Sequence, residues 1–188
     1  MDLQPFVSML RSGGVVACPT ETQFGLLADA LDARAVQCVC EMKRRPAGEP
    51  IPVLVSSLAA ALEIAIDVSG AATALADAHW PGPLTLVMRA RGELPPALLR
   101  SGTIALRVPG PSPALELVQA FAGPLTATSA NLSGRPPLAS EAELRATFGS
   151  ALAGVVPGTA PGAPASTIVD VTGARPIVLR QGAIALPV

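Results

Sequence analysis

Hydrophobic and polar positions divide the chain into short apolar runs and longer segments with helical spacing. Four consecutive apolar residues, Val15–Cys18, follow two glycines and stop at Pro19, which cannot donate a hydrogen bond to a sheet. This pattern predicts a short buried strand. Further strands are predicted over residues 51–55, 84–88, 103–109, 124–127, 166–171 and 176–180, and helices over residues 4–12, 32–45, 58–65, 69–78, 114–122 and 140–148.

The predicted strands and helices are mixed without strict alternation, and strands follow one another near the end of the chain. This arrangement indicates an α/β fold with a mixed sheet. A length of 188 residues is sufficient for one sizeable core, so a single domain over residues 1–188 is expected. Residues 157–164 are rich in Pro and Gly, which fits either a mobile lid or a plain linker.

Half of the residues are hydrophobic, yet no apolar run reaches the ~18 residues that a membrane span requires. The amino terminus lacks the basic start and apolar core of a signal peptide, so a soluble, cytoplasmic protein without membrane contact is expected. The net charge of −1 gives no global attraction for nucleic acid, and any RNA contact would need a local patch.

Several kinds of chemistry are disfavoured by the residue inventory. His79 is the only histidine, the three cysteines lack C-x-x-C spacing, and neither standard glycine-rich phosphate loop is present. Hydroxyls, an amide and cations instead stand at predicted strand ends and in loops, which suits an anionic, phosphate-bearing ligand. These candidates are Thr20, Thr22, Lys43, Arg45, Arg107, Ser129, Asn131, Ser166 and Arg180.

Each candidate also has an ordinary structural explanation. Pro19–Leu26 can be a simple strand-to-turn junction whose hydroxyls satisfy nearby backbone groups. Lys43, the only lysine, can be a solvated residue at a helix end, and the arginines can form surface ion pairs. Residue types alone leave these alternatives open.

Seven segments, in this order, resemble motifs of the YrdC/Sua5 family. They are Pro19–Leu26 (PTET-x-(Y/F)-GL), Lys43–Pro46 (K-x-R-P), Trp80–Leu86 (PGPLT), Thr103–Pro109, Ser129–Gly134 (SANLSG), Ser166–Asp170 (STIVD) and Leu179–Gly182 (LRQG). The similarity extends from about residue 6 to residue 184. It implies a single YrdC-like domain, with a twisted mixed parallel and antiparallel sheet, flanking helices and a central groove.

The resemblance also implies threonylcarbamoyl-AMP synthase activity, in which L-threonine, bicarbonate and ATP give L-threonylcarbamoyladenylate and diphosphate. The product serves the N6-threonylcarbamoyladenosine modification of tRNA, so the implied partners are the transferases of that pathway, with a tRNA or double-stranded RNA contact as a further expectation. Mg²⁺ is expected to arrive with ATP, and no separate metal site is expected.

Site roles follow by motif position from the same resemblance. Lys43 and Arg45 are expected to be catalytic by placing positive charge on the phosphates. The expected ATP-binding residues are Lys43, Arg45, Thr103, Asn131 and Arg180, and the expected L-threonine-binding residues are Thr22, Arg107, Ser129 and Ser166. The chemistry needs alignment and positive charge rather than a histidine base or an enzyme nucleophile.

Two residues depart from the family pattern. Phe24 stands where many relatives have Tyr, and Leu54 stands where longer relatives have His, so fine contacts to the substrate differ. Two other functions fit the same resemblance: an RNA- or nucleotide-binding paralogue like YciO, and a carbamoyl-transfer domain like those of hydrogenase maturation.

Overall fold

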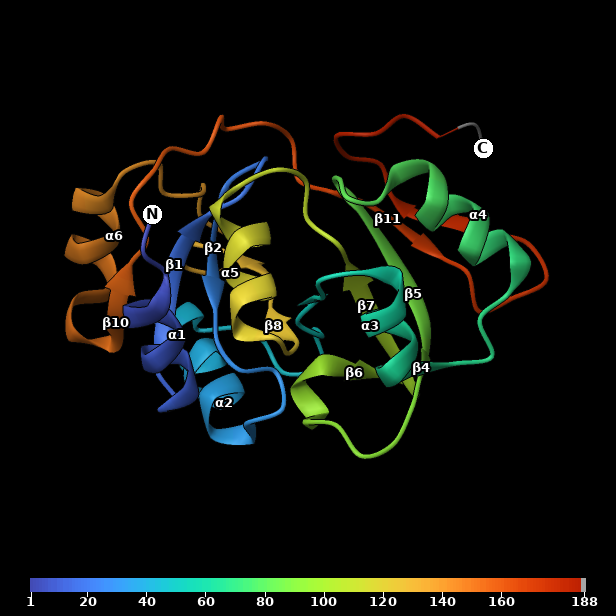
Figure 1. Cartoon of the computed structure of the whole chain (residues 1–188), viewed down its shortest axis with the longest axis horizontal. Helices are drawn as coiled ribbons and strands as arrows, with labels where there is room; N and C mark the ends of the chain where they lie inside the picture. The colour runs from blue at the N-terminus through green and yellow to red at the C-terminus, as the bar shows by residue number, and fades with distance from the viewer. Residues whose placement is uncertain (187–188) are drawn as a thin grey trace.

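The computed structural model describes residues 1–186, in which strands and helices form two mixed sheets with helices packed on them (Figure 1). The smaller sheet has the order β10 (Leu152–Val155), β1 (Val15–Pro19), β2 (Phe24–Leu27), β9 (Thr128–Ser129). The larger has the order β12 (Ile177–Arg180), β11 (Thr167–Asp170), β5 (Leu84–Ala90), β7 (Thr103–Arg107), β3 (Val53–Leu54), β8 (Leu125–Thr126), with β4 (Ala65–Ile66) on β5 and β6 (Leu99–Arg100) on β7.

The helices divide between the two halves of the molecule. The helices are α1 (Gln4–Arg11), α2 (Ala33–Lys43), α3 (Leu58–Ile64), α4 (Gly70–His79), α5 (Pro113–Phe121) and α6 (Glu141–Phe148), with short 3₁₀ turns at Pro96–Leu98 and Gly149–Ala151. In Figure 1, α1, α2, α5 and α6 gather around the smaller sheet, whereas α3 and α4 lie beside the larger one.

Strand β1 is buried on both faces, which explains its unbroken apolar sequence. Val16 and Cys18 belong to the apolar cluster that contains α1 and α5, whereas Val15 and Ala17 belong to the cluster that contains α2 and α6. Alternate side chains of one strand therefore anchor two different layers of helices.

Local capping sets the helix boundaries. Asp32 accepts a hydrogen bond from the backbone N–H of Arg34 at 2.8 Å, and Ser140 and Glu143 form a reciprocal capping box at the start of α6. Helix α2 ends at Lys43, two residues before the predicted end, because Arg44 adopts a left-handed conformation with φ of 49°.

The mixed α/β class predicted from the sequence is confirmed, although the strands form two sheets where a single one was expected. Strands β2 and β10 were not predicted, because Phe24–Leu27 and Leu152–Val155 lack a polar and apolar alternation that would mark them. Within residues 1–186, no helix is long and apolar enough to span a bilayer.

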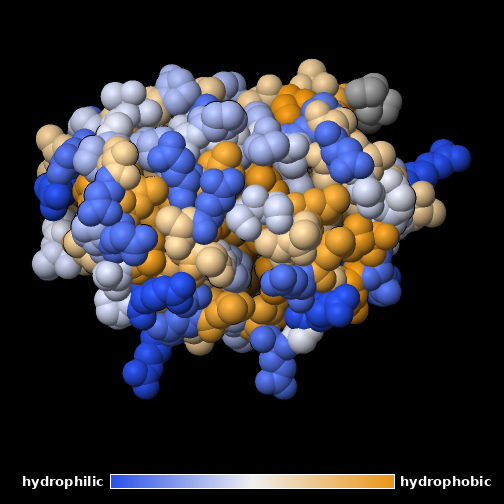
Figure 2. Space-filling view, viewed as in Figure 1, coloured by the Kyte–Doolittle hydropathy of each residue, from blue (hydrophilic) through white to orange (hydrophobic). Residues whose placement is uncertain are grey.

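The two sheets leave a gap whose walls carry side chains from both. On the larger sheet, Val87 of β5 lies opposite Ala105 of β7, and Leu54 of β3 lies beside Arg107. Figure 2 shows hydrophilic side chains over the outer parts of one face and hydrophobic ones gathered toward its middle and right.

Candidate functional site

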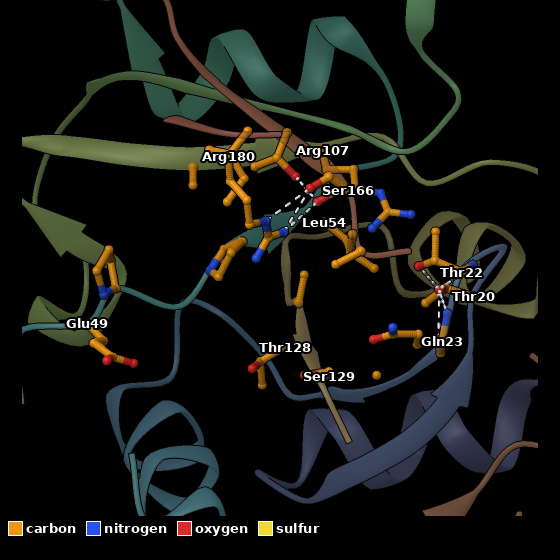
Figure 3. A pocket seen from close by; sticks show the side chains of 18 of the residues that line it. Thr20, Thr22, Gln23, Glu49, Leu54, Arg107, Thr128, Ser129, Ser166 and Arg180 are labelled. Atoms are coloured by element: carbon orange, nitrogen blue, oxygen red, sulfur yellow. Dashed lines mark hydrogen bonds between the residues drawn. The ribbon is translucent and has the colours of Figure 1, made fainter. Parts of the chain in front are cut away.

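A hollow of about 440 Å³ lies between the two sheets. From the smaller sheet and its turns come Thr20, Thr22, Gln23, Phe24, Gly25, Leu27, Thr128 and Ser129, and from the larger sheet come Leu54, Thr85, Val87, Ala105, Arg107, Ser166, Ile168, Leu179 and Arg180. Its volume falls within the usual range of about 300–1,000 Å³ for small-molecule sites. Figure 3 shows Thr20 and Thr22 at one end and Glu49 at the other.

The turn between β1 and β2 is held by its own side chains. The Thr20 hydroxyl donates to the carbonyl of Gln23 at 2.7 Å and accepts from the backbone N–H groups of Thr22 and Gln23. The hydroxyls of Thr20 and Thr22 are 3.0 Å apart, and both residues are buried. The turn therefore holds the Thr22 hydroxyl in one place at the end of the hollow.

Arg107 is a buried cation at the end of β7. Its Nε donates to the carbonyl oxygen of Gly82 at 3.2 Å, and its Nη2 forms an ion pair with Glu21 at 2.5 Å. The Arg107 side chain is 9% exposed and lines the hollow. A guanidinium held on one side by Gly82 and Glu21 has its remaining N–H groups left for an anionic ligand.

Ser166 contacts both the buried hydroxyl of Thr85 and a second guanidinium, that of Arg180. Its Oγ is 2.8 Å from Oγ1 of Thr85, which is 1% exposed, and its backbone carbonyl accepts from Arg180 Nη2 at 2.8 Å. Burial, and to a lesser extent the positive charge of Arg107, lower the pKa of Arg180. Two like charges facing one hollow favour an anion between them.

Arg45 contributes a third guanidinium from the segment after α2. Its Nε donates to the carbonyl of Glu49 and its Nη2 to that of Pro50, both at 2.9 Å. The Glu49 carboxylate is 3.9 Å from Nη2 and largely exposed, so this ion pair is weak. Arg45 thereby shapes residues 45–50 into one wall of the hollow.

Lys43 lies behind that wall. Its side chain donates to the backbone carbonyls of Ser129 and Asn131 and to Asn131 Oδ1, and the residue is 2% exposed. Burial, together with the charge of Arg45, lowers the pKa of Lys43 to about 8. The three donated bonds use every proton of the ammonium, so Lys43 fixes the segment that carries Ser129.

The structure brings most of the predicted site residues together. Those that line the hollow are Thr22, Arg45, Arg107, Ser129, Ser166 and Arg180. Lys43 and Asn131 do not line it, but both are bonded to Ser129, which does. Direct contact of these two residues with ATP stays a prediction.

Thr103 lies apart from the other predicted residues. It stands at the opposite end of β7 from Arg107, and its hydroxyl donates to the carbonyl of Arg100 at 2.7 Å. It lines a second, smaller hollow of about 300 Å³ instead, whereas Arg100 lines the main one. Thr103 therefore does not line the main hollow in this structure, and its contact with ATP stays a prediction.

Several lining residues were missed at the sequence level. Gln23, Thr128 and Glu49 are adjacent to predicted residues or motifs, so proximity in sequence was the available signal. Thr85 stands within the PGPLT motif, but its inward orientation depends on the pairing of β5 with β11. The apolar floor of Leu54, Val87, Ala105 and Ile168 arises only when four strands align.

The Pro- and Gly-rich segment 157–164 runs past the threonine turn. The backbone N–H of Ala163 donates to the carbonyl of Thr22 at 3.0 Å, and Gln23 Nε2 donates to the carbonyl of Ala163 at 3.1 Å. These two bonds connect the segment to the end of the hollow. Within residues 1–186, no cluster of three or more His, Cys, Asp or Glu side chains is arranged to hold a metal ion.

Comparison with known proteins adds independent information. Residues 8–182 match the family profile named Sua5_yciO_yrdC, which carries the description "Telomere recombination". The chain is 36% identical over 185 residues to the threonylcarbamoyl-AMP synthase of Vibrio cholerae, covering 96% of this chain and 97% of that protein. It is 37% identical to the synthase of Pyrococcus abyssi over 94% of this chain, but it spans only 53% of that longer protein.

Solved structures agree with the same fold. Pyrococcus abyssi Sua5 in complex with L-threonine superposes with a TM-score of 0.89 at 34% identity, covering 96% of this chain and 54% of that one. Escherichia coli YciO superposes with a TM-score of 0.84 at 24% identity, covering 96% of this chain and 88% of that one. The second likeness supports the fold alone.

Proposed function

The chain belongs to the Sua5/YciO/YrdC family, and we propose that it is a threonylcarbamoyl-AMP synthase. The proposed reaction joins L-threonine, bicarbonate and ATP to give L-threonylcarbamoyladenylate and diphosphate, for the t6A modification of tRNA. The observation that carries the proposal is the convergence of arginines, among them Arg45, Arg107 and Arg180, with hydroxyl side chains on one hollow.

The reaction has a balanced course that these residues can support. The amine of threonine adds to bicarbonate and loses water, which gives a carbamate. A carbamate oxygen then attacks the α-phosphorus of ATP, and the bond to the β-phosphate oxygen breaks to release diphosphate. The nucleophile is already anionic, so the protein must align the reactants and neutralise their charge.

We assign the cations of the hollow to the two anionic substrates. Arg107, beside the threonine turn, is placed to bind the carboxylate of L-threonine, with Thr22 on the same side. Arg45 and Arg180 are placed to bind the phosphates, and the apolar floor can accept the flat face of a base. We assign Ser129, from the smaller sheet, and Ser166, which contacts Arg180, to the carbamate.

Magnesium enters this proposal as part of the Mg–ATP substrate. Mg²⁺ usually keeps several waters and binds through one or two carboxylates together with substrate phosphates. Glu49, at one end of the hollow, is the carboxylate among its described lining residues, which fits a metal carried by ATP.

The test is threonine-dependent diphosphate release by the purified protein, with ¹⁴C-bicarbonate to follow carbon into the nucleotide product. The proposal predicts release that requires threonine, bicarbonate and ATP together. Arg45→Ala is predicted to reduce the rate by about 100-fold, the usual effect of one lost charge-stabilising group. Arg89→Ala, an exposed arginine outside the main hollow, is the matched control.

A different result would favour another function. ATP binding without turnover would indicate a nucleotide-binding paralogue, and diphosphate release that does not depend on threonine would indicate hydrolysis of ATP by water. Salt-dependent RNA affinity in the absence of ATP would indicate an RNA-binding role. In each case, the absence of threonine-dependent diphosphate release would contradict the synthase proposal.

A further inference from the structure

Glu21 is a buried acid that the proposed reaction does not use directly. It stands in the turn between β1 and β2, on the smaller sheet, and its side chain is 16% exposed. Its Oε1 accepts from Arg107 Nη2 at 2.5 Å and from the backbone N–H of Gly110 at 2.7 Å. Both partners belong to the larger sheet or the segment directly after it, so Glu21 connects the two walls of the hollow.

The segment that receives Glu21 is fixed on its other side. Gly82 donates its backbone N–H to the carbonyl of Val108 at 2.9 Å and accepts from Arg107 Nε at 3.2 Å. The Arg107 guanidinium is therefore held between Gly82 and Glu21. Removing either contact would free it to rotate within the hollow.

A side chain at position 110 would displace Glu21 from its present position. A Cβ atom at position 110 would lie 2.9 Å from Cγ of Glu21 and 3.1 Å from its Oε1. Gly110 has no left-handed backbone conformation that would itself demand glycine. The close approach of the Glu21 side chain is therefore the observed reason for a glycine here.

The two carboxylate oxygens of Glu21 differ in their contacts. Oε2 is buried without a hydrogen-bond partner among the described residues. A buried acceptor without a donor lowers the free energy of unfolding. Such groups occur in native proteins where they serve a function. Here the other oxygen positions a cation at the wall of a binding site.

We propose that Glu21 is a positioning residue for the amino-acid substrate, which orients the Arg107 guanidinium toward the substrate carboxylate. This inference rests on the proposed function, because it assumes that Arg107 binds that carboxylate. Glu21 does not line the hollow, so it acts only through Arg107 and through the spacing of the two sheets.

Two variants test the proposal by different routes. Glu21→Gln keeps the shape and removes the charge, whereas Gly110→Ala keeps the charge and displaces the Glu21 side chain. Each is expected to raise the KM for L-threonine by about 10- to 100-fold, as expected for a broken buried charge pair, with the KM for ATP nearly unchanged. Glu141→Gln, which removes the exposed ion pair to Arg145 on α6, is the matched control and should leave both constants unchanged.

A double variant separates positioning from general destabilisation. If Glu21 acts through Arg107, then Glu21→Gln combined with Arg107→Lys should bind threonine no more weakly than Arg107→Lys alone. Additive losses would overturn the proposal. An unchanged or lower threonine KM in Glu21→Gln would also overturn it, because the carboxylate would then merely compete with the substrate for Arg107.

Titration calorimetry with L-threonine alone distinguishes this proposal from the proposed function. Wild-type protein that binds threonine but makes no threonine-dependent diphosphate would overturn the synthase proposal only. Wild-type protein that is active, with Glu21→Gln equal to it in threonine affinity, would overturn the Glu21 proposal only.

Discussion

Replacing Lys43 with Met removes a buried cation but keeps most of its stem. The wild-type ammonium donates to the carbonyls of Ser129 and Asn131 and to Asn131 Oδ1. Oδ1 keeps a donor, the Ser129 hydroxyl at 2.6 Å, and the Ser129 carbonyl keeps the backbone N–H of Asn131 at 3.0 Å. Of the three acceptors, the carbonyl of Asn131 therefore loses its donor without a replacement.

Lys43→Met should lower both the stability and the activity of the protein. One buried acceptor left without a donor costs about 1–3 kcal/mol, and relief of the buried charge offsets part of the other losses. For a domain of this size, about 2–4 °C per kcal/mol gives a Tm lower by about 2–12 °C. Loss of positive charge next to the phosphate wall, with a loosened Ser129, should reduce kcat/KM by about 100-fold or more.

The assay is threonine-dependent diphosphate release together with thermal unfolding. Arg44→Met is the control, because it removes the same charge from the neighbouring residue, whose side chain is exposed. A Lys43→Met protein that unfolds at the wild-type temperature and keeps activity within about threefold of the wild type would contradict the proposed role of Lys43.

Four further predictions concern the same site. Because burial lowers the pKa of Lys43 from 10.5 to about 8, the ammonium loses its proton above about pH 8 and the rate should fall, so a flat pH–rate profile would contradict its role. The unfolded chain keeps that proton up to about pH 10.5, so this group should make the folded state more stable as pH rises from 8 to 10.5, measurable as unfolding free energy against pH. Gly182→Ala should reduce both stability and activity, because its Cβ would lie 2.1 Å from the carbonyl oxygen of Ala165; wild-type Tm and rate in this variant would count against it. Thr85→Val should cost about 1 kcal/mol and raise the threonine KM, since it removes the buried partner of the Ser166 hydroxyl; kinetics identical to the wild type would disprove this contact's importance.

Much of the fold was predictable where the signal is local. The apolar run of β1, the Asp32 cap and the Ser140 capping box each depend on neighbouring residues, and each element formed, although β1 includes Pro19 and α2 ends two residues before its predicted end. The division into two sheets was not predictable in this way. It depends on pairings such as β1 with β10, which lie far apart in sequence.

The candidate site also depends on contacts between residues far apart in sequence, which could not be predicted. Hydroxyls and cations in motifs were identified individually, but the sequence did not distinguish Arg107, which lines the hollow, from Lys43, which lies behind it. Glu21 was missed because an acid in a turn is normally solvated, and its partner lies 86 residues further along the chain. Glu21 reaches Arg107 and Gly110 only because the two sheets pack close together.

The most direct measurement is a crystal structure of the protein with L-threonine and a non-hydrolysable ATP analogue. We predict the threonine carboxylate on Arg107 and the phosphates against Arg45 and Arg180, all within the hollow between the sheets. Ligands bound elsewhere, or a threonine carboxylate without contact to Arg107, would contradict it.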